Sequence, residues 1–324
     1  MKLFRRTEPV ARVAFNTRPL AGPYGGANQW VTQLTRYLGQ CGYEVRYDLR
    51  KPVDCLMLTH QGTSGRLLFS AAEIRDYRSQ HPRVRVIQRI NDNDRRKGTG
   101  EMNDLLAETN AVTDHTVFVS EWLREHHAGL WFDGKKSSSV ILNGADPAAF
   151  HPIGGCVFDG RGPLRLVTHH WSDNWNKGFK VYAEIDAMIA DGRLPNTALR
   201  IIGRWPAEIR WRAAETFGPH SGRPLARLLR ECHVLVSASL WEPGAMHPVE
   251  GIQCGLPLLY HEDSGGTVEL GKKFGIGFRE DIAGAIEQIR QCYHELRARA
   301  VSEPPSGDLM CLEYRRLIQR CLAL

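Results

Sequence analysis

Short apolar runs alternate with amphipathic stretches along most of this chain of 324 residues. An apolar run bounded by Gly, Pro or polar residues predicts a buried strand, whereas apolar spacing of three and four predicts a helix. The runs predict strands at 11–17, 43–49, 53–60, 83–90, 115–120, 140–144, 164–170, 199–205, 233–238 and 258–260. The amphipathic stretches predict helices at 30–38, 102–109, 121–127, 180–190, 224–232, 246–254, 281–296 and 308–324. This alternation is typical of an α/β protein with parallel sheets.

A segment rich in glycine interrupts the alternation near the middle of the chain. It has the sequence HPIGGCVFDGRGP and covers residues 151–163. Linkers between domains have this composition, and a chain of this length accommodates two cores. We therefore expect a first domain of residues 1–153, a second of residues 154–305 and a final helical segment, 306–324. Each domain opens with strand, loop and helix, which predicts a doubly wound, Rossmann-like unit whose ligands lie beyond the carboxyl ends of its strands.

The stretch 232–270 contains the clearest candidate site. Its first strand ends in a break at 241–244, a helix follows, and two carboxylates, Glu242 and Glu250, bracket the turn between them. The first amides of a helix lack internal partners and attract phosphate oxygens. An ionised carboxylate accepts hydrogen bonds from neighbouring sugar hydroxyls. A turn with both features predicts a nucleotide-sugar site.

Five features of this stretch, in order, resemble the donor-binding segment of the GT-B glycosyltransferases, most closely the retaining family 4. They are Glu242, Glu250, the turn 255–257, the pair Gly265 and Gly266, and Glu269. The order V-F-V-S, helix, V-I-L-N-G-x-D-x-x-x-F-x-P also resembles the crossing between the two domains of that family. The resemblance implies two Rossmann-like domains with a central cleft. It also implies that the last helix crosses back to the first domain.

The resemblance further implies roles for particular side chains. Glu250 would hold the ribose hydroxyls of the donor, and Glu242 would hold the sugar hydroxyls near the reacting carbon. Lys177 and the nearby backbone amides would hold the phosphates, so Glu242 and Lys177 would take part in catalysis. The donor-binding residues expected in full are Gly25, Gly26, Lys177, Arg204, Glu242, Gly244, Ala245, Met246, His247, Glu250, Gly265, Gly266 and Thr267.

The chain departs from the family pattern at two places. The family has an arginine about four residues before a Lys-Gly pair, and here the segment 169–175 replaces that arginine while Lys177 remains. We expect Lys177 to carry more of the phosphate charge, with help from Arg204 or a protonated His170. The second departure lies just after Gly244, where Met246 and His247 would face the sugar.

Polar residues at the ends of two first-domain strands are our candidates for the acceptor side. They are His60, Arg89 and Asp92. The pattern Asp92-Asn93-Asp94 also matches the metal-binding Asp-x-Asp of the GT-A glycosyltransferases, since hard cations prefer clustered carboxylates. The basic residues 95–97 directly after it would offset this charge. We therefore expect no metal and no other cofactor besides the nucleotide-sugar substrate.

The formal charge of +6 lies mostly before residue 150, where Lys and Arg exceed Asp and Glu by five. Such a domain would attract an acidic acceptor, such as a lipid phosphate, an anionic glycan or nucleic acid, although a solvated face fits equally well. The eight cysteines form no C-x-x-C pair, and no apolar run approaches the ~20 residues that cross a bilayer. With no apolar leader before the first strand, these features predict a cytoplasmic protein without a transmembrane segment. The final helix leaves peripheral membrane contact open.

The resemblance implies a retaining glycosyltransferase that needs no metal, and together with the site residues it predicts transfer from a UDP- or GDP-sugar to a hydroxyl acceptor. One alternative keeps the fold and takes a nucleic-acid base or another polyanion as acceptor, for which a steep salt dependence is typical. Another is a non-catalytic GT-B module that binds a glycan or a nucleotide and releases no nucleoside diphosphate. A sugar-nucleotide epimerase with the same fold is a third.

Overall fold

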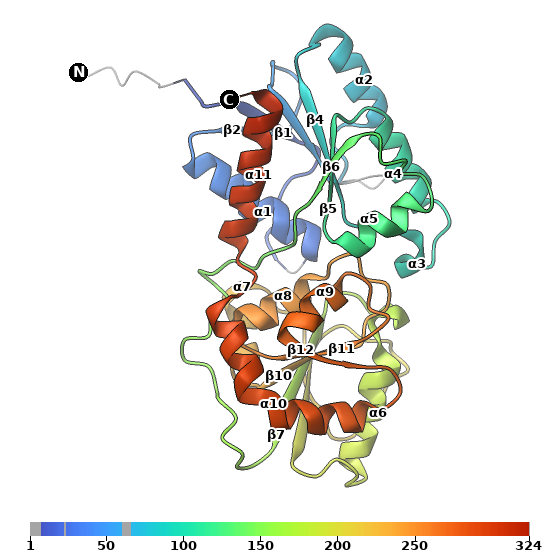
Figure 1. Cartoon of the computed structure of the whole chain (residues 1–324), viewed down its shortest axis with the longest axis vertical. Coiled ribbons are helices and arrows are strands. Elements are labelled where there is room, and N and C mark those ends of the chain that lie inside the picture. The colour runs from blue at the N-terminus through green and yellow to red at the C-terminus, as the bar shows by residue number, and fades with distance from the viewer. Residues whose placement is uncertain (1–7, 23, 60–65, 324) are drawn as a thin grey trace, which may run out of the picture.

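Two α/β units are stacked along the long axis of the molecule (Figure 1). The computed structural model describes residues 8–22, 24–59 and 66–323. Each unit contains one six-stranded sheet, and all strand pairings among the described residues are parallel. The predicted α/β class with two parallel sheets is confirmed.

The first sheet has the strand order β2-β1-β3-β4-β5-β6. Its strands are β1 (Arg12–Phe15), β2 (Glu44–Arg46), β3 (Cys55–Leu58), β4 (Arg85–Ile90), β5 (His115–Phe118) and β6 (Ser137–Val140). The helices between them are α1 (Gly26–Gln40), α2 (Ala71–Gln80), α3 (Asp94–Lys97), α4 (Met102–Ala111) and α5 (Glu121–Ala128). Successive β1 residues point to opposite faces: Val13 and Phe15 share a core with α1, and Ala14 shares one with α2. Helices therefore cover both faces of the sheet.

The second sheet has the order β12-β11-β10-β7-β8-β9. Its strands are β7 (Leu164–His170), β8 (Thr197–Gly203), β9 (Glu215–Phe217), β10 (Val234–Ser237), β11 (Leu258–His261) and β12 (Gly275–Phe278). The helices are the 3-10 turn η1 (Trp175–Lys177), α6 (Phe179–Ala190), α7 (Gly222–Arg230), α8 (Met246–Gln253), α9 (Thr267–Phe274) and α10 (Ile282–Ser302). Val234 and Val236 of β10 pack in the core with α6 and α10, whereas Leu235 packs with α7 and α8.

The last helix, α11 (Gly307–Leu322), lies beside α1 on the first unit (Figure 1). Tyr314 of α11 and Trp30 of α1 are fully buried, with ring centroids 5.3 Å apart. At the start of α11 the Gly307 amide donates to the Ala145 carbonyl at 2.7 Å. A Cβ on Gly144 would overlap the backbone there, which explains the glycine. The C-terminal segment therefore completes the core of the first unit.

Several elements differ from the sequence-based expectation: β6 is shifted, and α2, α3, η1, β9, α9 and β12 have no counterpart among the predicted elements. Strand β6 lies at the sheet edge and consists of serines and one valine, Ser137–Val140, whereas the predicted strand was 140–144. Only the first residues of the apolar run, Val140 and Ile141, reach the sheet, and the Ile141 amide donates to the Phe118 carbonyl at 3.0 Å. Helix α2 is absent from the predicted elements because it buries few residues, although Ser70 and Glu73 form a capping box at its start.

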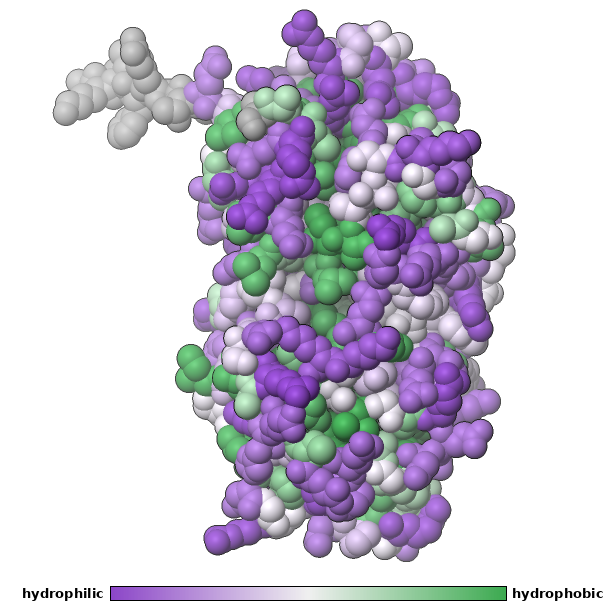
Figure 2. All heavy atoms as spheres, in the orientation of Figure 1, coloured by the Kyte–Doolittle hydropathy of each residue, from purple (hydrophilic) through white to green (hydrophobic). Residues whose placement is uncertain are grey.

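Polar side chains cover much of both units on the face drawn in Figure 2. Apolar side chains appear among them as separate groups and where the two units meet. Over the described part of the chain, no helix combines the length and the apolar character needed to span a membrane.

Candidate functional site

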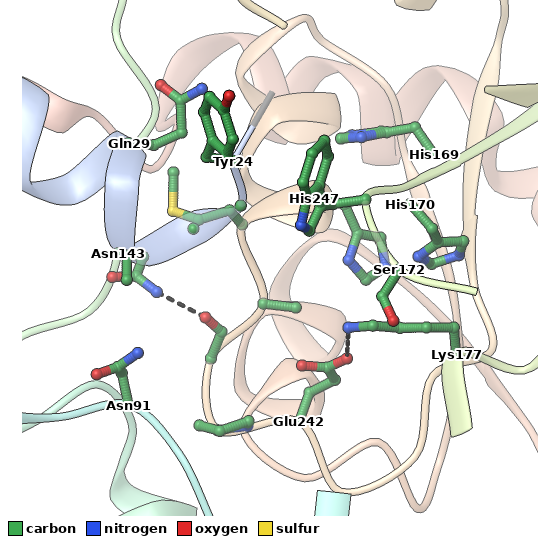
Figure 3. Close-up of a pocket in the computed structure, with 18 of the residues that line it drawn as sticks. Tyr24, Gln29, Asn91, Asn143, His169, His170, Ser172, Lys177, Glu242 and His247 are labelled. Carbon is green, nitrogen blue, oxygen red and sulfur yellow. Dashed lines mark hydrogen bonds and ion pairs between the residues drawn. The ribbon is translucent and has the colours of Figure 1, made fainter. Parts of the chain in front are cut away.

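A cleft of about 530 Å³ lies between the two units, at the carboxyl ends of several strands. Thr59 after β3, Asn91 after β4 and Asn143 after β6 line it from the first unit. His170 at the end of β7 and Glu242 after β10 line it from the second. Figure 3 shows side chains from both units around the same space. Doubly wound folds bind their ligands at this edge of the sheet, so the cleft is the candidate site.

An ion pair between Lys177 and Glu242 lies on the second-unit wall of the cleft (Figure 3). Their side chains are only 14% and 5% exposed. Lys177 ends the turn η1, and Gly178 follows with a φ of 87°, which favours glycine. A Cβ on Gly178 would overlap the backbone of Ala238, so the turn packs directly on the chain that leads from β10 to Glu242. This packing keeps the two members of the ion pair together.

Helix α8 begins at the cleft with amides that its own side chains do not cap. Ala245 occupies the capping position, and its side chain has no hydrogen-bond acceptor. Residues 244–247 all line the cleft. The carbonyl of Gly244 accepts a hydrogen bond from Asn143 Nδ2 at 2.6 Å (Figure 3). This contact from the first unit orients the turn while its free amides remain available to an anion.

A second helix begins on the opposite wall of the cleft. Helix α1 starts at Gly26, and Gly25 before it has a φ of 82° and no side chain that caps the helix. The starts of α1 and α8 are close together, because a Cβ on Gly26 would come within 2.7 Å of Met246 Cγ. The positive ends of two helix dipoles, one from each unit, therefore meet in the cleft. This is a strong anion-binding arrangement.

Of the histidines that line the cleft on the second-unit side, three are buried: His169, His170 and His247 (Figure 3). The ring of His247 lies 4.8 Å from that of His170, centroid to centroid. Burial lowers the pKa of His169 to about 4 and lowers the pKa of the other two well below the usual value. The prediction that a protonated His170 helps Lys177 with the phosphate charge is therefore wrong. Its buried ring contacts the hydroxyls of Thr168 and Tyr182, each at 3.0 Å, and stays neutral.

Glu250 faces the cleft from α8 and is only 5% exposed. One carboxyl oxygen lies 3.4 Å from Nε2 of His169. Burial raises the pKa of Glu250 to about 8, so the side chain is mostly protonated at pH 7. A protonated carboxyl donates one hydrogen bond and still accepts others. Glu250 can therefore hold a pair of neighbouring hydroxyls in either protonation state.

The predicted phosphate loop of Gly265, Gly266 and Thr267 lies outside the cleft lining. Gly265 forms a β-bridge with Glu242, and the Gly266 amide donates to the Glu242 carbonyl at 2.8 Å. A Cβ on Gly266 would overlap the carbonyl of Pro243. The loop supports the backbone of the Glu242 turn and affects the site through that turn.

Arg204, another predicted donor residue, also lies outside the cleft lining. Its guanidinium carbon is 4.0 Å from the ring centroid of Trp171, and Trp171 itself lines the cleft. Of the described residues, the second unit contributes a single lysine or arginine to the cleft wall, Lys177.

Two predicted acceptor-side residues, Arg89 and Asp92, line the first-unit wall, and the third, His60, lies outside the described residues. Arg89 is 1% exposed and donates hydrogen bonds to Thr59 Oγ1 at 3.1 Å and to Asn143 Oδ1 at 2.9 Å. Arg89 thereby orients the asparagine that holds the Gly244 turn.

The two carboxylates of the Asp-x-Asp pattern take part in different local networks. Asp92 forms ion pairs with Arg96 and Lys97, at 2.9 and 2.7 Å. Asp94 accepts a hydrogen bond from the Met102 amide at 2.8 Å, at the start of α4. Within the residues that the structure describes, no group of three His, Cys, Asp or Glu side chains is placed to hold a metal ion.

Three asparagines that join the two units are absent from the predicted site. They are Asn93, Asn143 and Asn176. An amide side chain carries no charge, so residue type alone does not mark it as a site residue, although Asn143 belongs to the V-I-L-N-G motif. The available signal is adjacency, because Asn93 follows Asp92 and Asn176 precedes Lys177.

No protein-family model matches the chain, and no curated protein matches its sequence. Solved structures match almost its whole length. A sucrose-phosphate synthase from Thermosynechococcus elongatus superposes with a TM-score of 0.72 at 13% identity, covering 97% of this chain and 99% of that chain. The catalytic domain of starch synthase IV from Arabidopsis thaliana, bound to ADP and acarbose, has a TM-score of 0.70 at 11% identity, with 98% and 100% covered. Anabaena Alr3699/HepE, in complex with UDP and glucose, has a TM-score of 0.65 at 12% identity, with 96% and 100% covered.

At identities this low, the likeness establishes the fold and leaves the choice of family open. These neighbours are GT-B glycosyltransferases, and the match extends over both units. The chain therefore has the GT-B fold, with two Rossmann-like units and a central cleft, as its sequence predicts.

Proposed function

We propose that the protein is a glycosyltransferase that moves a sugar from a nucleoside diphosphate sugar to a hydroxyl acceptor. The observation that carries this proposal is the meeting of the α1 and α8 starts beside the Lys177–Glu242 pair, in one cleft. Free amides at helix starts bind phosphate oxygens, and carboxyl groups bind sugar hydroxyls. A nucleotide sugar carries both kinds of group.

The order of these features along the cleft suggests how the donor binds. The diphosphate lies between Gly25–Gly26 and residues 244–247. Glu250, one turn further along α8, faces the ribose hydroxyls, and the base lies toward residues 219–221, which also line the cleft. Glu242 then faces the hydroxyls of the transferred sugar. Two neighbours of the same fold are in complex with UDP and with ADP, which supports a nucleotide as the ligand.

In the proposed reaction, the bond between the anomeric carbon and the diphosphate oxygen breaks, and its electron pair leaves with the phosphate. The acceptor oxygen forms a new bond to that carbon from the same face, so the configuration is retained. The acceptor proton passes to the departing phosphate oxygen, and no separate base is required. Lys177 and the free amides stabilise the charge that develops on the leaving group. These residues supply that charge stabilisation without a metal, and we propose a metal-independent transfer.

A thermal-shift series with UDP-, GDP- and ADP-glucose tests donor binding, since a ligand that binds the folded state raises the melting temperature. We expect one donor to stabilise the wild type and to have no effect on Glu250→Ala. The matched control is Glu280→Ala, because Glu280 is exposed and lies outside the cleft. If Glu250→Ala responds to the donor like the wild type, the ribose placement is wrong.

Release of nucleoside diphosphate from the stabilising donor tests catalysis separately. We expect slow release by hydrolysis and faster release with an acceptor, both abolished in Glu242→Gln. Binding without any release would support the non-catalytic module instead. Acidic acceptors, including nucleic acid, belong in the acceptor screen because of the basic first domain, and their binding should weaken steeply with salt.

A further inference from the structure

Positive charge is unevenly divided between the two walls of the cleft. A leaving nucleoside diphosphate carries more than one negative charge, and that charge must be stabilised during transfer. Among the described residues, the second-unit wall offers only Lys177, whose charge is already paired with Glu242. The first-unit wall offers four cations: Arg66, Arg89, Arg96 and Lys97. Among the described residues, every cation that could assist Lys177 from the cleft wall therefore belongs to the first unit.

Arg96 is the first-unit cation best placed for this role. Its side chain lines the cleft and is 22% exposed, whereas Arg89 is almost fully buried and bonded to its neighbours. Burial alone would lower the pKa of Arg96, but the carboxylates of Asp92 and Glu242 raise it above its usual value. Glu242 belongs to the other unit, so the Arg96 guanidinium lies within electrostatic reach of the ion pair across the cleft.

Three contacts tie the segment around Arg96 to the second unit. Asn176 Nδ2 donates to the Arg96 carbonyl at 3.0 Å, and Asn93 Nδ2 donates to the Trp241 carbonyl at 3.2 Å. The guanidinium carbon of Arg95 lies 4.4 Å from the ring centroid of Trp241. Asn176 and Trp241 are the residues directly before the two members of the ion pair. The residues that directly precede Lys177 and Glu242 therefore hold helix α3 close to this ion pair.

We propose that Arg96 acts with Lys177 as the second cation of the diphosphate site. The proposal rests on the proposed function and adds a residue from the opposite unit to its catalytic machinery. Asp92 is a positioning residue: its Oδ1 accepts hydrogen bonds from Nη2 and Nε of Arg96 at 2.9 and 3.3 Å. In the proposed arrangement the donors of Nη1, which Asp92 does not engage, bind a phosphate oxygen. Arg96 forms no covalent bond and loses no proton, because a guanidinium stays charged throughout the reaction.

Calorimetric titration with UDP, GDP and ADP tests this role in the wild type, Arg96→Gln and Arg96→Lys. Uridine, guanosine and adenosine, followed by ligand-observed NMR, report binding that needs no phosphate contact. We expect Arg96→Gln to bind the preferred diphosphate roughly ten- to hundredfold more weakly, as for the loss of a charge-assisted hydrogen bond. The affinity for the matching nucleoside should stay within about twofold, since ribose and base contacts are unchanged. Arg96→Lys should recover part of the loss.

Arg124→Gln is the matched control, because Arg124 is a half-exposed first-unit arginine on α5 that does not line the cleft. Equal losses for diphosphate and nucleoside in Arg96→Gln would show a structural role and overturn the proposal. An unchanged diphosphate affinity would overturn it as well, while leaving the proposed function intact. A wild type that binds none of the three diphosphates would overturn the proposed function and this inference together.

Discussion

The two walls of the cleft are built differently. On the second-unit wall, Glu242 is 4% exposed, its charge is paired with Lys177, and its backbone rests on the loop 265–267. On the first-unit wall Arg89 is buried as well, but Gly26 and Arg96 are half-buried, and their backbone meets the side chains of Met246 and Asn176 in the other unit. The second-unit wall is therefore part of a packed core, whereas the first-unit wall at Gly26 and Arg96 is a surface that contacts the other unit.

The two walls should accordingly respond to substitution in different ways. A change in a packed region disturbs stability and binding together, because neighbouring groups cannot move aside without cost. A change on the first-unit wall should alter ligand binding with little loss of stability. One glycine pair in each unit, Gly25–Gly26 in the first and Gly265–Gly266 in the second, allows a direct comparison.

The largest effect is expected for Gly266→Ala in the loop under the Glu242 turn. The new methyl group would overlap the Pro243 carbonyl of the Glu242 turn and the side chain of Ser120, a fully buried residue at the start of α5. We expect the free energy of unfolding to fall by about 3 kcal/mol, with loss of donor binding, measured by urea denaturation and thermal shift.

The control for this change is Gly39→Ala, near the end of α1. A Cβ there would meet nothing within 4 Å, so alanine should be neutral or slightly stabilising. If Gly266→Ala were as stable as that control, the loop would not be the packed support that the second-unit wall requires.

The next largest effect is expected for Gly26→Ala on the first-unit wall. Its Cβ would approach Met246 Cγ to 2.7 Å, which forces the Met246 side chain or the start of α1 to shift. We expect affinity for the preferred nucleoside diphosphate to fall about tenfold, measured by calorimetric titration, because the two helix starts must separate.

The unfolding free energy of Gly26→Ala should fall by less than about 1 kcal/mol, since a half-buried helix start can adjust. A stability loss as large as that of Gly266→Ala would remove the distinction between the walls.

Much of the second-unit wall could be predicted from the sequence because its parts are close together along the chain. Glu242, the helix start and Glu250 occupy one short stretch in which spacing has a direct geometric meaning. The role of Gly265 and Gly266 could not be predicted in the same way. Glycine permits close packing of backbone as readily as the approach of a ligand, and the structure shows backbone packing here.

The first-unit wall was much harder to predict from the sequence. Asn93 and Arg96 follow β4, Asn143 follows β6, and all three gain their roles only from contacts with the other unit. The charge of His170 depended on burial in the same way, because a ring inside a core stays neutral whatever its sequence neighbours. The fold class was predictable because apolar periodicity is a local property.

The pH dependence of stability tests whether the second-unit wall around Glu250 is buried as in a core. Folded Glu250 has a pKa of about 8, well above its value in the unfolded chain, so the folded state binds more protons between these values. Stability therefore falls as pH rises toward and through 8. Between pH 7.5 and 9 we expect a loss of about 1 kcal/mol that Glu250→Gln does not show, measured by chemical denaturation at several pH values.

Above pH 7.5 the buried histidines are largely neutral in both states, so they do not obscure this comparison. Glu280→Gln, an exposed glutamate, serves as the control and should follow the wild-type pH profile. Identical profiles for Glu250→Gln and the wild type would mean that Glu250 is solvated and that the wall around it is open.

The smallest effect is expected for Arg204→Gln, although the sequence places Arg204 among the donor residues. The side chain is exposed, stacks on Trp171 and does not line the cleft, so its charge acts from outside the site. We expect less than about a threefold change in diphosphate affinity and a stability loss of about 0.5 kcal/mol from the lost stacking contact. A tenfold or larger loss of affinity, matching that of Arg96→Gln, would show that the second unit supplies its own second cation. The charge shortage on that wall, and the need for a cation from across the cleft, would then disappear.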